Sequence, residues 1–341
     1  MPVGLRGVGK TVLLNRFQEI ATQEGLEVGY IEAPEGGDFA SMLAICLRKI
    51  LLRMDQGAVS ALVTKALRVL KSFTLTLPDG SSVNIDTEAW KGEADSGVLN
   101  EDVTDLLVAA GEAARERRSG IVIAVDEVQY LTAPELAAAI VAIHRTTQLD
   151  LPVVLVGAGL PQLRGLAGES KSYAERLFEF PEVGALDESD ASGVLSVPAE
   201  EQGVEFTEEA LREVVRASYG YPYFLQEWGH RAWNVAADNR IDLDDITVCK
   251  PLVQKALDGS FFRVRLDRLT PKEKEYLRAM AELGPGPHRS GDIAGQLGVR
   301  VESVAPRRSG LIKKGMIYSP AHGDTAFTVP LFDDFLRRII P

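Results

Sequence analysis

A phosphate-binding loop at the start of the chain constrains the fold more than any other feature. Residues 4–11 read GLRGVGKT, which matches the pattern G-x-x-x-x-G-K-[ST]. In such a loop, backbone N–H groups cradle phosphates, the lysine reaches the β- and γ-phosphates, and the hydroxyl binds Mg²⁺. A helix should begin there, and apolar residues do recur at helical spacing over 10–23. The predicted nucleotide contacts are Gly4, Gly7, Gly9, Lys10, Thr11 and Val12.

Only Met1, Pro2 and Val3 precede this loop, although such a loop normally follows a buried parallel strand. Without that strand, the neighbouring strands would have unpaired backbone groups, at about 1–3 kcal/mol for each buried group. We expect the natural chain to begin earlier, with Met1 as a downstream start or an expression boundary. The alternative is that a partner chain or a rearranged strand fills the gap.

The pattern of apolar runs predicts a parallel α/β sheet that ends near residue 183. Strands are expected at 26–31, at 121–125 (IVIAV), within LPVVLVGAG and within RLFEFPEV, with helices between them. The alternating stretch 73–85 contains a Pro-Asp-Gly turn and is predicted to be an inserted β-hairpin.

The rest of the chain is predicted to form two smaller domains. Residues 184–262 show helical patterns only, near 187–196, 207–217, 221–237 and 244–257, so we expect an all-helical domain. Residues 263–341 begin with a capping box, in which Thr270 is the N-cap and Glu273 its partner. Two short helices around a turn and a final hairpin then predict a winged helix. The first domain is accordingly 1–183.

Charge and composition narrow the class of protein. The chain carries 37 basic and 49 acidic residues, a formal net charge of −12, which argues against a general nucleic-acid coat protein. Residues 266–341 differ, with 12 basic and 9 acidic residues. No apolar run approaches the ~20 residues that span a bilayer, so no membrane association is expected. Cys46 and Cys249 are predicted to be buried free thiols in a reducing cytoplasm.

Two acids follow the apolar run 121–125 directly. Asp126 and Glu127 should therefore lie at the carboxyl end of a buried strand, where α/β proteins bind ligands. We predict that Asp126 binds Mg²⁺ together with Thr11, and that Glu127 orients or deprotonates the attacking water. The less specific interpretation is a pair of solvated acids at a strand end.

The order of these features resembles an AAA+-type P-loop ATPase: a GKT loop, Asp126-Glu127, a helical lid and a terminal winged helix. More narrowly, the chain is similar to the bacterial and archaeal ATPases that are grouped with origin-recognition proteins and the STAND signalling switches. The resemblance covers essentially the whole chain. It implies ATP and Mg²⁺ as cofactors, and it favours ATP over GTP because no N-K-x-D motif accompanies DEVQYL.

At three further positions, where the family usually has functional residues, this chain matches the family less well. The strand VVLVGAGLP ends in Gly157, Ala158 and Gly159, where such families usually have a polar sensor side chain, so fast hydrolysis is not expected. Arg176 stands where an arginine finger is often found, although an arginine that closes a helix explains it equally well. Pro222, in SYGYPYF, resembles the G-x-P lid motif of STAND switches, although a proline in a first helical turn is as good an explanation.

The winged helix carries four basic residues on its predicted recognition helix: Arg307, Arg308, Lys313 and Lys314. They could neutralise DNA phosphates or reach base edges. Against this, cations near a helix C-terminus are favourable without any DNA. In related switches the winged helix often packs against the ATPase core instead.

The sequence therefore predicts a Mg-ATP-binding, slowly hydrolysing ATPase that acts as a conformational switch. The first alternative is an ATP-controlled DNA-binding regulator or replication-initiator-like protein. The second is an interaction scaffold that does not hydrolyse ATP. A homo-oligomer or protein partner is compatible with all three.

Overall fold

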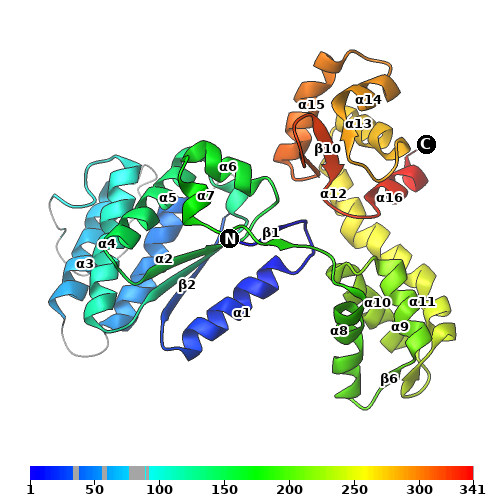
Figure 1. Cartoon of the computed structure of the whole chain (residues 1–341), viewed down its shortest axis with the longest axis horizontal. Coiled ribbons are helices and arrows are strands. Elements are labelled where there is room, and N and C mark those ends of the chain that lie inside the picture. Colours follow the sequence, from blue (N-terminus) through cyan, green and yellow to red (C-terminus); the bar gives the residue numbers. More distant parts are fainter. Residues whose placement is uncertain (34–37, 56–59, 77–88, 90–91, 341) are drawn as a thin grey trace. The chain divides into compact units, whose positions relative to one another are not determined.

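A computed structural model describes the whole chain except residues 34–37, 56–59, 77–88, 90–91 and 341. The chain divides into two compact units (Figure 1). The first comprises Met1–Val3 and Lys10–Glu182, and the second comprises Gly4–Gly9 and Val183–Pro341.

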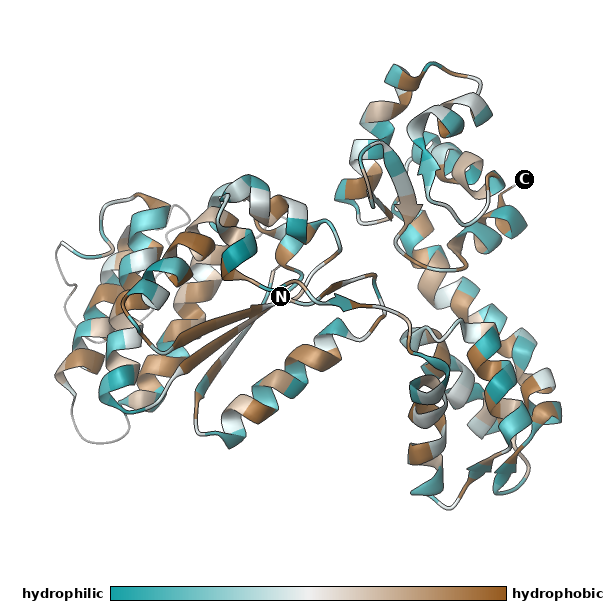
Figure 2. Cartoon of the chain, viewed as in Figure 1, coloured by the Kyte–Doolittle hydropathy of each residue, from teal (hydrophilic) through white to brown (hydrophobic). Residues whose placement is uncertain are grey.

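A parallel sheet forms the centre of the first unit. β2 (Glu27–Glu32), β3 (Ile121–Asp126) and β4 (Val153–Gly157) are hydrogen-bonded in this order and run parallel. Every residue of β3 is buried, as its unbroken apolar run predicts, and the hydrophobic colouring of the strands is visible in Figure 2. The predicted parallel α/β class is confirmed.

Helices cover both faces of this sheet. Alternate β3 residues face opposite sides, so Ile121, Ile123 and Val125 join the large core with the helices of one face. Ala124 faces α1 and belongs to a much smaller cluster. The helices of the unit are α1 (Lys10–Gln23), α2 (Phe39–Met54), α3 (Ala61–Thr76), α4 (Leu99–Glu116), α5 (Ala133–Gln148), α6 (Leu163–Ser170) and α7 (Ala174–Leu177), with a 3-10 turn η1 (Val128–Tyr130) after β3.

Two predicted elements differ from the structure. The first strand of the predicted hairpin over 73–85 is wrong, because residues 73–76 belong to α3, in which Phe73 is buried. Residues 77–85 of that hairpin lie outside the described residues. The strand predicted within RLFEFPEV is also mostly wrong, because α7 includes its first two residues and β5 spans only Glu182–Val183. Burial of Phe178 and Phe180 explains the apolar alternation without a full strand.

The residues before the phosphate loop form a very short strand. β1 spans only Val3–Gly4 and pairs with β5. The Val3 N–H donates to Pro181 O (2.9 Å), and the Gly159 N–H, just after β4, donates to Pro2 O (3.2 Å). Val3 also forms a parallel bridge with Gly159. The short N-terminal segment therefore lies between the end of β4 and residue 181.

Beside this segment lies an apolar groove of about 390 Å³. Phe17 and Ile20 of α1 and Val154 and Val156 of β4 line it, next to Met1. Ile20 is 43% exposed and Val154 54%, which is unusual for residues that face each other across a sheet–helix layer. The groove therefore lies along the part of β4 that β1 does not cover.

The second unit begins with four helices close to those predicted. They are α8 (Glu188–Glu200), α9 (Glu208–Ser218), α10 (Pro222–Val235) and α11 (Leu243–Ala256), with a short parallel pair of β6 (Glu205–Phe206) and β7 (Arg240–Ile241). A π-helical turn η2 (Leu257–Phe262) and α12 (Arg263–Asp267) follow. No helix in the described part of the chain is long and apolar enough to cross a membrane.

The C-terminal part of this unit has the predicted winged-helix order. Its elements are α13 (Pro271–Glu282), β8 (His288–Arg289), α14 (Ser290–Gln296), α15 (Val301–Lys313), β9 (Ile317–Tyr318), β10 (Asp324–Phe327) and α16 (Phe332–Ile339). The strands form an antiparallel sheet in the order β8-β10-β9. The capping box of Thr270 and Glu273 is present. Phe262 packs against both Phe224 of α10 and Phe335 of α16, so one aromatic core joins the two halves of the unit.

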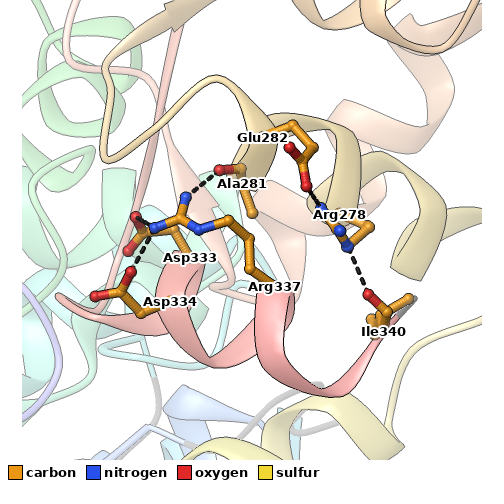
Figure 3. Close-up of polar contacts among 7 residues, drawn as sticks. All are labelled: Arg278, Ala281, Glu282, Asp333, Asp334, Arg337 and Ile340. Atoms are coloured by element: carbon orange, nitrogen blue, oxygen red, sulfur yellow. Dashed lines mark hydrogen bonds and ion pairs between the residues drawn. The ribbon is translucent and has the colours of Figure 1, made fainter.

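The terminal helix α16, which the sequence analysis did not predict, is fastened to α13 by two arginines (Figure 3). Arg337 donates to Ala281 O and pairs with Asp333 at 3.1 Å. Arg278 Nε donates to Ile340 O at 2.6 Å. Arg337 thus gives Ala281 O a second donor beside the Gly284 N–H (3.2 Å), and Arg278 gives a donor to the Ile340 carbonyl at the end of α16.

Both cysteines are buried free thiols, as predicted. Cys46 lies in α2 and Cys249 in α11. Burial raises the pKa of each thiol to about 11. A thiol with so high a pKa is mostly protonated at neutral pH and therefore a poor nucleophile.

Candidate nucleotide site

The first unit brings the two predicted metal ligands together. The Thr11 hydroxyl, in the first turn of α1, donates to Asp126 Oδ2 at the end of β3 (2.5 Å) although 115 residues separate the two. Asp126 is 4% exposed. Its other oxygen, Oδ1, accepts the N–H of Glu127 (2.8 Å). The phosphate-loop helix and the acidic strand end are thus joined by a direct hydrogen bond.

These groups suit Mg²⁺. A hydroxyl and a carboxylate are the hard oxygen ligands that Mg²⁺ prefers, and Mg²⁺ commonly takes only one or two protein ligands beside phosphates and water. Thr11 is exposed, so one side of the pair is open to a phosphate and to water. The residues present therefore fit the ion. Mg²⁺, when bound, would neutralise charge on the phosphates.

Two residues of β2 extend this acidic group, and the sequence analysis missed both. Glu32 is paired in register with Asp126, and Tyr30 lies two residues earlier on the same face. Burial, followed by the charges of Asp126 and Glu32, raises the pKa of Tyr30 to about 12, so the phenol stays protonated at neutral pH. The sequence EVGYIE could have indicated them. Its polar residues stand at the carboxyl end of a strand parallel to β3, and the carboxyl ends of parallel strands lie at the same edge of the sheet.

Glu127 is held by its backbone and by one neighbouring amide. Its φ of 54° and ψ of 38° are left-handed, a conformation that is uncommon for a residue other than glycine and that turns the chain sharply after β3. Gln129 Nε2 donates to Glu127 Oε2. Gln129 also accepts the Leu160 N–H (3.0 Å), so it lies at the site although no motif identified it.

In the second unit, the phosphate loop contacts the start of α10. The Tyr221 hydroxyl donates to Arg6 O, and the Tyr223 N–H donates to Gly7 O (3.1 Å). Gly7 has a φ of 88°, and a Cβ there would lie 3.1 Å from Tyr223 Cβ. Pro222 occupies the first turn of α10 between the two tyrosines. The two tyrosines that flank Pro222 are thus hydrogen-bonded to the phosphate loop.

The remaining loop residues are placed as follows. Gly4 fits closely, because a Cβ there would collide with Val183 O, whereas Gly9 needs glycine for its φ of 92°. Lys10 is buried, at 6% exposed, at the start of α1. Val12 is 71% exposed. The nucleotide contacts of these residues remain predictions.

Arg176 lies in the short helix α7 with its side chain exposed. Within the described part of the chain, it forms no ion pair with an acidic residue. This exposure is compatible with an arginine finger and equally with a surface arginine. Its catalytic role stays a prediction.

Three of the four basic residues of the winged helix make internal contacts. Arg308 donates to Thr325 Oγ1 (2.9 Å), to Ser319 Oγ and to Asp324 O, which ties α15 to the β9–β10 hairpin. Lys314 pairs with Glu273 (2.8 Å), and Arg307 lies 3.8 Å from Glu275. Lys313 is exposed. Of the four, Lys313 is therefore the residue best placed to meet a phosphate of DNA.

A parallel sheet, a phosphate loop that leads into a helix and an acid pair at the end of a neighbouring strand define the class of P-loop nucleotide-binding proteins. Comparison with known families agrees. Residues 2–166 match the AAA domain family, so this part of the chain belongs to the AAA domains, with the P-loop ATPase fold. Residues 259–336 match a family described as a domain of unknown function (DUF8462). No curated protein sequence matches the chain significantly.

Solved structures resemble the chain over nearly its whole length. They include the RuvB Holliday junction branch migration motor of Thermotoga maritima (16% identity, TM-score 0.45, covering 100% of this chain and 87% of that one). Cdc6p of Pyrobaculum aerophilum has 14% identity and a TM-score of 0.44, covering 100% and 88%. The Orc1 protein of Aeropyrum pernix, solved in complex with DNA, has 16% identity and a TM-score of 0.45, covering 99% and 86%.

Proposed function

We propose that this protein binds Mg-ATP and hydrolyses it slowly, and that the nucleotide cycle serves as a conformational switch. The observation that carries the proposal is the hydrogen bond between Thr11 and Asp126. It brings together the two motifs whose residues would share one metal ion. Lys10 would bind the phosphates, and Glu127 would orient the attacking water. Arg176, which is exposed, would stabilise charge on the phosphates of its own or a neighbouring chain.

The switch part of the proposal rests on the bonds of Tyr221 and Tyr223 to the loop. Both bonds go to carbonyl groups of the phosphate loop, at Arg6 and Gly7. A change in loop conformation on phosphate binding would therefore alter the first turn of α10. We expect ATP and ADP to produce different amide hydrogen exchange at Tyr223, with slower exchange in the state that keeps the bond to Gly7 O.

Calorimetric titration of the chain with Mg-ATP tests the binding step. We expect saturable binding, and we expect Lys10→Ala to weaken it at least about 30-fold, because removing one partner of a buried ion pair costs about 2 kcal/mol or more. Lys272→Ala is the matched control, since Lys272 is exposed on α13. Absence of binding to the wild-type chain, or equal affinity in Lys10→Ala, would reject the proposal.

The second candidate is duplex DNA binding by the winged helix, which the α14–turn–α15 arrangement beside the β8-β10-β9 sheet supports. The variants that test it must leave Arg308 intact, because its bonds hold the hairpin. We expect Lys313→Ala and Arg289→Ala to weaken duplex binding, and the salt slope to fall by about one unit for each lost phosphate contact. No saturable binding at about 50 mM salt would exclude this candidate.

A further inference from the structure

One side chain, that of Gln129, links the carboxylate of Glu127 to the loop after β4. Gln129 lies in the 3-10 turn η1 and is half-buried. Its Nε2 donates to Glu127 Oε2, and its Oε1 accepts the Leu160 N–H at 3.0 Å. The same amide group therefore donates one hydrogen bond to Glu127 and accepts another from the loop after β4.

The geometry of the loop after β4 depends on this amide. A Cβ at Gly159 would lie only 2.8 Å from Gln129 Oε1 and 3.0 Å from Leu163 Cδ2. A Cβ at Gly157 would lie 2.9 Å from Val128 Cγ2. A side chain at 157 would therefore require Val128 of η1 to shift, and one at 159 would displace the Gln129 amide. The polar group beside the end of β4 comes from Gln129 of η1, whose Oε1 accepts the Leu160 N–H.

Glu127 has little else to fix its side chain. Within the described residues, Gln129 is the hydrogen-bond partner of its carboxylate. Its backbone is held by the N–H bond to Asp126 Oδ1 (2.8 Å). Because a carboxylate has two oxygens, the bond at Oε2 leaves Oε1 to accept a hydrogen bond from water. A free side chain would sample several rotamers, whereas the amide bond favours one.

We propose that Gln129 is a positioning residue, which holds the Glu127 carboxylate in the orientation that activates water and ties it to the end of β4. This inference rests on the proposed ATPase function. Gln129 acts through Glu127 and does not itself need to touch the nucleotide. Its removal should therefore lower turnover and leave ATP affinity unchanged.

Two substitutions separate the effect of losing the donor of the Gln129 amide from the effect of losing its acceptor. Gln129→Leu removes both, whereas Gln129→Glu keeps an acceptor for the Leu160 N–H but turns a like charge toward Glu127. We expect kcat to fall about tenfold in both variants, with ATP affinity within about twofold of wild type. Gln148→Leu, at an exposed glutamine near the end of α5, is the matched control and should change neither.

A double-mutant cycle then identifies the residue through which Gln129 acts. In a Glu127→Gln background, adding Gln129→Leu should lower kcat no further, because the positioned carboxylate is already gone. A tenfold loss in both backgrounds would mean that Gln129 acts independently of Glu127. That result, or an unchanged kcat in Gln129→Leu, overturns the proposal.

Hydrogen exchange gives a readout that needs no turnover. The Leu160 amide should exchange faster in Gln129→Leu than in wild type and remain protected in Gln129→Glu, which keeps the acceptor. Equal protection in wild type and Gln129→Leu would show that the link to β4 does not exist in solution and would overturn the inference. If the wild-type chain binds ATP but shows no turnover, the hydrolytic function fails and the catalytic role of Gln129 fails with it. The exchange result still decides whether Gln129 links η1 to β4.

Discussion

Replacing Glu127 by glutamine is expected to lower kcat about 10²–10³-fold, while ATP affinity stays within about twofold of wild type. A positioned general base commonly contributes rate factors of this size. Glu127 follows Asp126 at the carboxyl end of β3, and its left-handed backbone turns its side chain away from the strand direction. Glutamine has the same shape and can still accept the Gln129 amide at its own carbonyl, but it cannot take up a proton.

Single-turnover and steady-state kinetics on purified protein measure this loss. Glu188→Gln makes the same change at an exposed position in α8 and should leave kcat unaltered. A Glu127→Gln variant that turns over like wild type would show that Glu127 is not the base. A variant that loses affinity and turnover together would show instead that the carboxylate contributes to nucleotide binding.

The sequence predicted the parts of the site that are carried by local motifs. The loop, its helix and the acid pair were identifiable because each requires particular residue types at fixed spacing, and the Thr11–Asp126 bond joins the two residues that are predicted to share a metal ion. The fold class followed from the unbroken apolar run of β3. The winged helix followed from the order of helix, two short helices around a turn, and hairpin, and the start of its first helix followed from a capping box that depends on only two side chains.

The residues that were missed depend on tertiary structure. Tyr30 lies near Asp126 only because β2 pairs with β3 in a particular register, which a single sequence does not reveal. Gln129 was overlooked because a polar sensor was sought on β4, whereas the amide comes from η1. The roles assigned to Arg308 and Lys314 assumed a free helix face, but the hairpin and α13 supply partners for both. Pattern and charge alone do not show which cations are already paired.

The short first strand β1 and the groove beside it lead to the second large expected effect. Fusing a five-residue segment such as Val-Ile-Val-Ile-Val before Met1 should raise the free energy of unfolding by about 2–4 kcal/mol. The segment would continue Met1–Val3 along β4 into the groove of about 390 Å³ and cover Val154 and Ile20. Burying several such side chains stabilises by about 1.5–3 kcal/mol each, from which the cost of ordering five residues must be subtracted.

Backbone pairing gives the prediction its specificity. Ala158 bonds to residues 125 and 128 on the β3 side, whereas Gly159 bonds to Pro2 on the other side. Because backbone groups alternate sides along a strand, those of Gly157 and Leu155 should face the groove, where an added strand can pair with them. A segment with proline at its centre has nearly the same apolar content but lacks one donor and should stabilise much less.

Denaturant unfolding of the two extended chains and of the original chain therefore separates two explanations of any gain. A gain confined to the all-Val/Ile segment would show that the groove accepts a paired strand. Equal gains from both segments would show nonspecific apolar burial, and no gain from either would contradict the strand-shaped groove. Because the added strand leads directly into residues 4–11, a paired segment should also hold the phosphate loop more firmly. Tighter Mg-ATP binding in that chain alone would then link the stability of the sheet to the function of the loop.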